Sequence, residues 1–141
     1  MKKITIIIAA ILLIMFFIMG CDKDKYHRDR YVGDWDFVTR SEWYQTDSIS
    51  GKYVLIGCDT IYYLGTITYG DTENSLIIQY TENDKAKILI NKHGKLFTLC
   101  PGAYCECGEF EGEDKVHFKL GWITPQNPEY INGVKLERRQ K

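Results

Sequence analysis

Four of the five cysteines in this chain are spaced so that they could do chemistry with one another: Cys58, Cys100, Cys105 and Cys107. In an exported protein such thiols commonly pair as disulfides, and four cysteines allow three pairings. Cys105 and Cys107 are separated by one residue, so on a strand they point to the same face and do not bond each other. We expect a bridge from Cys58 to one member of the cluster. Free thiols and a zinc site are the alternatives, although structural zinc usually uses two Cys-x2–4-Cys pairs.

The other residue types that catalysis uses form no recognisable constellation. The three histidines are placed in a charged segment, a turn and the outward side of a strand: His27, His93 and His117. Gly-x-Ser-x-Gly, His-Glu-x-x-His and glycine-rich phosphate loops are absent from the sequence. The acidic residues between positions 106 and 114 indicate a solvated hairpin without EF-hand spacing. The sequence therefore predicts a protein that is not an enzyme, with no cofactor and no metal site.

The N-terminus indicates where the protein is located. Lys2 and Lys3 precede an apolar run over residues 4–19, which is followed by Gly20 and Cys21. A basic start, a short apolar core and a small residue are typical of an export signal. The run is also shorter than the about 20 residues that span a bilayer. Residues 18–21, Ile-Met-Gly-Cys, resemble the lipobox of bacterial lipoproteins, which implies cleavage before Cys21 and lipidation of its sulfur.

A lipidated Cys21 would anchor the mature chain to a membrane of the cell envelope, and we expect the outer membrane, on its periplasmic or surface face. Residues 22–30 are dense in charge and nearly devoid of apolar side chains, so we expect a tether there. Its acidic residues resemble the surface-export signals of lipoproteins in the Bacteroidetes. Without the signal the chain is acidic overall, which argues against nucleic-acid binding. The expected organisation is a signal peptide at 1–20, a lipidated tether at 21–30 and one β domain at 31–141.

The domain after the tether has the alternation of β-strands. Its clearest example places Val116, Phe118, Leu120 and Trp122 on one side of a strand, with polar residues between them. Turn-forming residues divide the chain into about eight to nine such strands. We therefore expect an all-β, antiparallel up-and-down barrel of about eight strands, with a β-sandwich as the alternative and the signal-peptide helix preceding it. Closure favours the barrel because it removes exposed sheet edges.

A family resemblance lies at the two ends of this domain. Gly33, Asp34 and Trp35 open the first predicted strand and resemble the Gly-x-Trp signature of lipocalins and the wider calycin group. In that family the tryptophan closes one end of the barrel and packs against an arginine of the last strand, a role that the resemblance gives to Arg138 or Arg139. Together with the lipobox and the final strand, this pattern resembles small lipocalin-like lipoproteins of the Bacteroidetes.

The expected function depends on what fills the barrel, because an eight-stranded barrel either is packed with side chains or holds one small ligand. Its aromatic residues are either core and wall or the lining of a pocket for an apolar or sugar ligand; the candidates are Tyr53, Tyr62, Tyr63, Tyr80 and Trp122. We expect a membrane-anchored binding module for a small apolar ligand. The alternative is an accessory subunit or inhibitor that binds another envelope protein, with a filled barrel.

Two short triplets suggest a modification. Asp47-Ser48-Ile49 and Asp59-Thr60-Ile61 resemble the Asp-Ser/Thr-aliphatic acceptor used for O-glycosylation of exported proteins in the Bacteroidetes. The resemblance makes Ser48 and Thr60 candidate sites. Ser48 is the more suitable of the two because it lies in a predicted loop.

Overall fold

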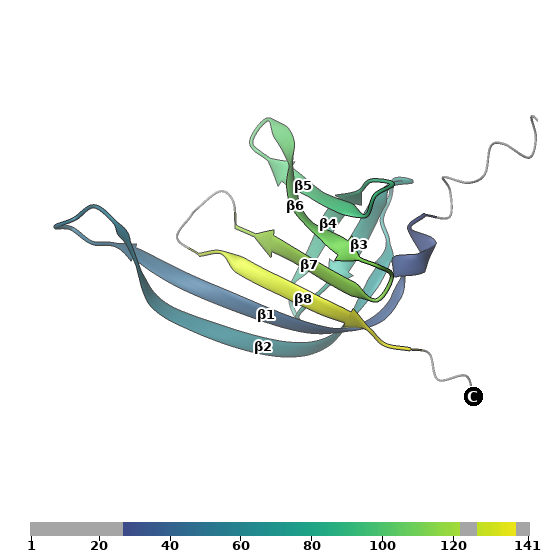
Figure 1. Cartoon of the computed structure of the whole chain (residues 1–141), viewed down its shortest axis with the longest axis horizontal. Helices are drawn as coiled ribbons and strands as arrows, with labels where there is room; N and C mark the ends of the chain where they lie inside the picture. The colour runs from purple at the N-terminus through teal and green to yellow at the C-terminus, as the bar shows by residue number, and fades with distance from the viewer. Residues whose placement is uncertain (1–26, 122–126, 138–141) are drawn as a thin grey trace, which may run out of the picture.

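The computed structural model of this protein describes residues 27–121 and 127–137. A short 3-10 helix and eight strands follow one another along the chain (Figure 1). Their bounds are η1 (Asp29–Tyr31), β1 (Gly33–Thr46), β2 (Tyr53–Tyr69), β3 (Ser75–Gln79), β4 (Lys85–Ile90), β5 (Lys95–Cys100), β6 (Ala103–Glu111), β7 (Lys115–Leu120) and β8 (Glu129–Lys135). Among the described residues no helix is long and apolar enough to cross a membrane. The predicted signal peptide and Cys21 lie outside the described residues.

The eight strands form one closed antiparallel barrel. Each strand pairs with its neighbour along the chain, and β8 closes the barrel by pairing with β1. The closing register runs from Trp35 opposite Lys135 to Ser41 opposite Glu129. This confirms the predicted up-and-down barrel of eight strands, and the alternative β-sandwich is wrong. Closure gives most strands a partner on both sides, as the argument from exposed edges required.

Apolar side chains from all eight strands fill the barrel interior. Along β1 the inward positions are Trp35, Phe37 and Thr39, all fully or almost fully buried, as the period of two requires. The other strands contribute aliphatic and aromatic residues to the same cluster: Ile67, Leu76, Ile78, Tyr80, Ile88, Ile90, Leu96, Cys107, Phe110, Val116, Phe118 and Ile131. Each fully buried large apolar side chain contributes about 1.5–3 kcal/mol. The barrel is therefore a packed core.

Glycine allows an aromatic ring to close the interior between three strands. Phe37 on β1 lies opposite Gly133 of β8. A Cβ added to Gly133 would lie 2.6 Å from Cε1 of Phe37, and one added to Gly65 of β2 would lie 2.9 Å from its Cδ2. The ring thus occupies the space that two missing side chains leave, and larger residues there would collide with it.

Strands β1 and β2 continue far beyond the barrel as a two-stranded arm (Figure 1). They have 14 and 17 residues, whereas β3 has 5 and β6 has 9. β8 pairs with β1 only as far as Ser41, and β3 pairs with β2 only from Thr66 onward. We call residues 42–65 the arm: the end of β1, the turn at 47–52 and β2 up to Gly65. Residues 42–58 project beyond the barrel, whereas residues 59–65 pair on one side with residues 35–41 of β1 in the barrel wall. A register shift between Trp43 and Tyr44 interrupts its pairing.

The described residues just before the barrel contact it. Nη1 of Arg28 donates hydrogen bonds to the carbonyl oxygens of Thr72 and Ser75, at 2.5 and 3.2 Å. The ring of Tyr31 stacks on Phe110 with 3.7 Å between centroids. The charge pattern did not predict this contact, because arginines that bind carbonyl groups at a barrel end have the same composition as a solvated spacer. The predicted boundary between tether and domain at residue 31 stays a prediction, with Arg28 on its tether side bound to the barrel.

Candidate functional site

Trp35 seals the barrel at the end where the chain enters. Its indole is completely buried, and its Nε1 donates a hydrogen bond of 2.9 Å to the carbonyl oxygen of Tyr31. Its ring neighbours among the described residues are Phe37 and Phe110, with centroids 6.2 and 5.8 Å away. Arg138, the expected stacking partner, lies outside the described residues. The predicted pair of Gly33 and Trp35 therefore sits at a closed end of the barrel.

The structure separates the residues predicted to line a pocket. Tyr53 and Tyr62 lie on the arm with their side chains exposed, Tyr62 to 75%. Tyr63 is the next residue of β2 and points to the other face, where its hydroxyl accepts a hydrogen bond of 3.2 Å from Nε2 of Gln79. Tyr80 is buried in the core, and Trp122 lies outside the described residues. The described tyrosines do not surround one cavity, because neighbours on a strand face opposite ways and Tyr53 lies beyond the barrel.

Tyr80 has a structural environment that the sequence did not indicate. Its hydroxyl donates a hydrogen bond of 3.1 Å to Oε2 of Glu129. Burial, and after it the neighbouring Glu129 carboxylate, raise the pKa of Tyr80 well above its usual value. The folded protein therefore holds this phenol in its protonated form.

This shift predicts a loss of stability in alkali. The unfolded chain releases the Tyr80 proton near pH 10, whereas the folded chain keeps it, so the contribution is complete below that pH and declines above it. We expect the free energy of unfolding to fall more steeply in the parent than in Tyr80→Phe, by at most about 1.4 kcal/mol for each pH unit. Urea unfolding at a series of alkaline pH values measures both slopes. Equal slopes would contradict the assignment.

The cysteines pair differently from the prediction. Cys100 and Cys105 form a disulfide across the β5–β6 hairpin, with 5.9 Å between their Cα atoms. The expected bridge to Cys58 is wrong, because Cys58 is exposed on the arm, outside the barrel. Cys107 is a buried free thiol, and burial raises its pKa to about 11. A site of four thiolates is excluded as well, since two of the sulfurs are bonded to each other.

The hairpin disulfide closes a short loop, so its effect on stability is expected to be modest. The two cysteines are 5 residues apart in sequence. Replacing both in Cys100→Ser/Cys105→Ser should lower the free energy of unfolding by about 2 kcal/mol. The matched variant Cys58→Ser should change it by less than about 0.5 kcal/mol. Urea unfolding compares the two, and an effect of Cys58→Ser as large as that of the double variant would contradict the pairing.

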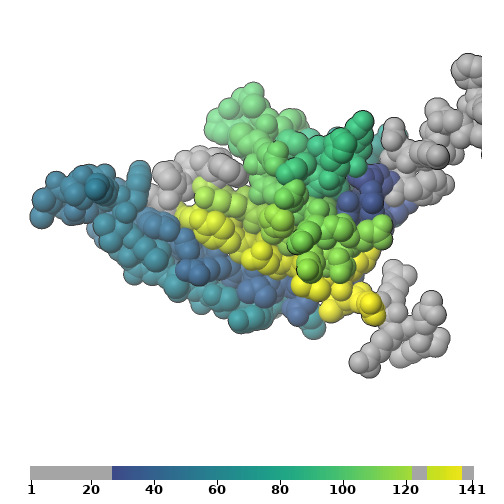
Figure 2. Space-filling view, viewed as in Figure 1, coloured from purple at the N-terminus to yellow at the C-terminus, as the bar shows by residue number. Residues whose placement is uncertain are grey.

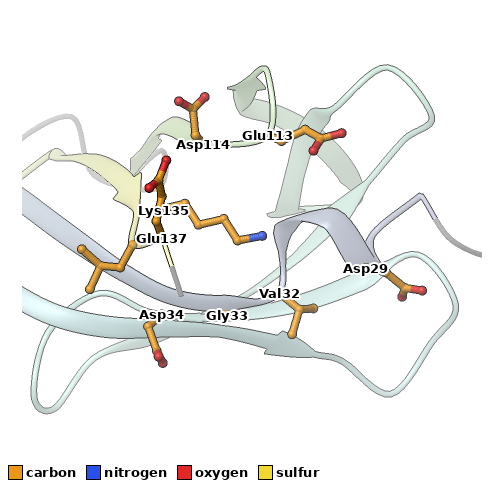
Figure 3. A pocket seen from close by; sticks show the side chains of 9 residues that line it. Asp29, Val32, Gly33, Asp34, Glu113, Asp114, Lys135 and Glu137 are labelled. Carbon is orange, nitrogen blue, oxygen red and sulfur yellow. The ribbon is translucent and has the colours of Figure 1, made fainter. Parts of the chain in front are cut away.

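A cavity of about 460 Å³ with charged residues in its lining lies outside the barrel, near the point where the chain enters it (Figure 3). It is lined by Asp29, Val32, Gly33, Asp34, Glu113, Asp114, Lys135, Leu136 and Glu137. Nζ of Lys135 donates a hydrogen bond to the carbonyl oxygen of Arg30. The side chains of Asp29, Asp34 and Asp114 point away from one another in Figure 3. Charged groups that do not converge suit neither an apolar ligand nor a bound cation, and no set of three metal-ligating residues occurs among the described residues.

The arm carries the largest collection of exposed apolar side chains on the described part of the chain, and its turn end projects from the barrel (Figure 2). Leu64 is 71% exposed and Ile49, at the turn, is 96% exposed. The other exposed apolar residues of the arm are Trp43, Tyr53, Val54, Leu55, Ile56, Ile61 and Tyr62. Soluble surfaces seldom gather so many, and such a patch usually marks an interaction site.

Few charges interrupt this surface. Within residues 53–65 of β2, Asp59 is the one charged residue. On β1 the carboxylate of Glu42 accepts a hydrogen bond of 2.7 Å from Tyr44 and pairs with Arg40 at 3.0 Å. The arm turn is fixed by Asp47, which accepts hydrogen bonds from the Ser50 hydroxyl and from the backbone N–H groups of Ile49 and Ser50. The Ser50 hydroxyl, and after it the two backbone groups, lower the pKa of this carboxyl. The arm therefore has a defined shape and a nearly neutral surface.

Both candidate glycosylation residues lie on the arm. Ser48 is exposed in the arm turn, as the predicted loop required, and Thr60 is exposed on β2. Sequence reasoning missed the arm itself because its residues have the same β-branched and aromatic composition as a buried strand. The one signal in the sequence was that apolar residues occupy both faces of this strand. Tyr62 and Leu64 lie on one face, and Ile61 lies on the other.

The fold defined by these elements is a filled eight-stranded antiparallel barrel with a projecting two-stranded arm. Comparisons with protein-family models, with curated proteins and with solved structures found no match to this chain.

Proposed function

We propose that this protein is a lipid-anchored protein of the cell envelope that binds another protein chain through the arm, with the barrel as its scaffold. The observation that carries the proposal is the contrast between the two surfaces. The interior is packed with buried side chains, whereas the arm exposes apolar residues such as Ile56, Tyr62 and Leu64 to solvent. The proposed envelope location, in the outer membrane, rests on the export signal and on lipidation of Cys21.

A carrier of small apolar molecules is the weaker proposal. Such a carrier needs an open apolar cavity with a few oriented polar groups. Phe37 instead closes the space between Gly65 and Gly133, and the cavity described above lies outside the barrel and has charged residues in its lining. We also propose that the role of the arm is binding and not catalysis. The arm offers an apolar surface for contact, and its polar groups do not converge on one point.

Site-specific crosslinking tests the proposal. A photoreactive phenylalanine analogue is placed at Tyr62 on the arm or, as the matched control, at Leu99 on β5, which is 71% exposed. The full chain is expressed in cells and irradiated in its own membranes. We expect a discrete crosslinked protein band from position 62 and none from position 99. Neither substitution should affect folding, since both side chains face solvent.

The competing role is tested on the same preparations. A panel of fluorescent apolar probes is titrated against the purified full chain in mild detergent. Two results together would contradict the proposal: no crosslinked band from position 62, and saturable binding of a probe. They would favour the alternative function, a carrier of small apolar molecules.

A further inference from the structure

We infer that the partner of the arm is a second copy of this chain, which pairs edge to edge along β2 in antiparallel orientation. This inference rests on the proposed function, because it names the partner that the arm binds. The paired arms would form a continuous four-stranded ribbon in the order β1-β2-β2-β1, with a barrel at each end. The argument comes from the backbone edge, the charge pattern and the register of residues 53–65.

The β2 edge is open over a long stretch. β1 occupies one side of β2 from Tyr53 to Ile67, but β3 covers the other side only from Thr66 to Tyr69. Among the described residues, positions 53–65 therefore pair with no strand on that side, and Gly65 at the end of this stretch lies against the backbone carbonyl of Gln79. The opposite edge of the arm is shorter, since β8 reaches Ser41 and the N–H of Glu42 donates to the carbonyl oxygen of Pro128 at 3.1 Å. The long free edge thus belongs to β2.

The occupant must supply hydrogen-bonding backbone groups. An unpaired strand edge presents a row of N–H and C=O groups, and lipid satisfies none of them. Insertion of the arm into a bilayer would leave this row unsatisfied at a cost of several kcal/mol for each group. An added strand satisfies the same groups and places its own side chains beside the apolar side chains of β2. A protein strand therefore fits this surface better than a membrane does.

The charge pattern favours a copy of the same strand. Protected edges usually carry lysine or proline, and residues 53–65 contain neither. A partner strand with several charges would find no complement there, because Asp59 is the one charged residue. A second β2 strand is equally neutral. Two such strands can approach each other with one constraint, which is that the two Asp59 side chains must not lie directly opposite.

That constraint narrows the register, and a centre at Cys58 satisfies it while keeping the matched residues short of the stretch that pairs with β3. In a two-fold symmetric antiparallel pair, one residue of the strand lies opposite its own copy, and residues equally spaced from it are matched on the same face. A centre at Asp59 is excluded by like charge. A centre at Cys58 places Asp59 opposite Gly57 and Thr60 opposite Ile56, and it matches residues 53–63. Tyr53 of one copy then lies opposite Tyr63 of the other, before β2 begins to pair with β3 at Thr66.

This arrangement also limits the assembly to two copies. Each copy uses its free β2 edge once, so the dimer leaves no second open edge of that length and does not extend into a fibre. Cys58, which is exposed and unpaired by any intramolecular disulfide, then faces its own copy. Directly opposite residues of antiparallel strands have Cα atoms about 4.5–5.5 Å apart, within the range that a disulfide spans.

The experiment is oxidative crosslinking of the full chain in its own membranes, read on non-reducing gels. Copper phenanthroline accepts the two electrons as two Cys58 thiols lose their protons and join. In a Cys58→Ser background, Ile56→Cys together with Thr60→Cys should crosslink, whereas Ile56→Cys alone should not, since its two copies are separated by about 14 Å along the ribbon. Leu99→Cys in the same background measures random collision. The expected product has twice the mass of the chain.

A second measurement avoids cysteine altogether. The variant Ile56→Lys/Thr60→Lys places like charges opposite each other twice, whereas Ile56→Lys/Thr60→Glu places opposite charges there. All of these positions are exposed, so both variants should fold. Light scattering of the detergent-purified full chain should give dissociation constants that differ by about tenfold, with the like-charged variant weaker.

The outcomes separate this inference from the proposed function. A crosslinked product from Tyr62 that contains a different protein, with no Cys58 dimer, would overturn the inference and leave the proposed function standing. No product from Tyr62 would overturn both. Equal crosslinking of Ile56→Cys and of the Ile56/Thr60 pair would overturn the register, and equal association of the two charge variants would do the same.

Discussion

Replacing Trp35 with alanine is expected to lower the free energy of unfolding by about 3–5 kcal/mol. The indole is completely buried at the barrel end and packs against Phe37 and Phe110. Its removal leaves a cavity that the surrounding strands cannot fill, because their registers are fixed by the closed barrel. The carbonyl oxygen of Tyr31 also loses the indole N–H as its donor. Urea unfolding of Trp35→Ala and the parent measures the difference.

The same strand provides the control for this prediction. Trp43 lies eight positions further along β1, on the arm, and is 39% exposed. Trp43→Ala removes the same side chain from a place where solvent already reaches it, so we expect a loss below about 1 kcal/mol. Equal losses for the two variants would show that Trp35 is not the closed end of a packed core.

The second large effect is expected from Gly133→Ala, which should lower the free energy of unfolding by about 1–3 kcal/mol. The added methyl group would lie 2.6 Å from Cε1 of Phe37 and 2.9 Å from Cγ1 of Val116. Neither side chain can retreat, since both are buried in the filled interior. Equilibrium unfolding in urea measures the loss.

Two further variants identify the cause of that loss. Gly57→Ala adds a methyl group on the arm, 3.2 Å from Cε3 of Trp43, and should cost less because this indole is partly exposed. Phe37→Leu in combination with Gly133→Ala should cost less than the sum of the two single changes, because the smaller side chain vacates the contested space. Additive losses would mean that Gly133 and Phe37 do not compete for one site.

Much of the barrel could be predicted from the sequence because closed antiparallel barrels leave a simple signature. Val116 and Phe118 on β7 and Ile131 on β8 point inward, and residues that face outward alternate with them along each strand. The turns around Gly70 and Gly94 separate one strand from the next. Glycine has positive φ at position 94, as a tight hairpin requires. Local pattern and global closure therefore agree over most of the domain.

The arm could not be predicted from the sequence pattern, and the cause is physical. The β-branched and aromatic composition of residues 53–57 and 60–69 predicts two separate strands, but these residues form one strand, β2, with Cys58 and Asp59 in its middle. β-propensity describes the fit of a side chain to a pleated surface, and it does not reveal whether another strand covers that surface. An exposed Tyr62 and a buried Phe37 therefore look alike in the sequence.

The disulfide illustrates the same limit. Cys100 and Cys105 are brought together by the β5–β6 hairpin, where Cys100 pairs with Ala103 and Thr98 pairs with Cys105. The turn that makes this possible has Gly102 at a φ of 81°. Spacing alone did not distinguish this local bridge from a longer one to Cys58, because the position of Cys58 outside the barrel depends on how far β2 extends.

The central claim is that a protein strand covers the open β2 edge while the barrel stays filled. Amide hydrogen exchange of the full chain tests it most directly, in its native membranes and again after dilution in detergent. The account predicts that about half of the amides in residues 53–65, those on the edge away from β1, exchange slowly in the membrane and quickly after dilution. Fast exchange of these amides in both states, with the barrel strands protected by an added apolar probe, would contradict it.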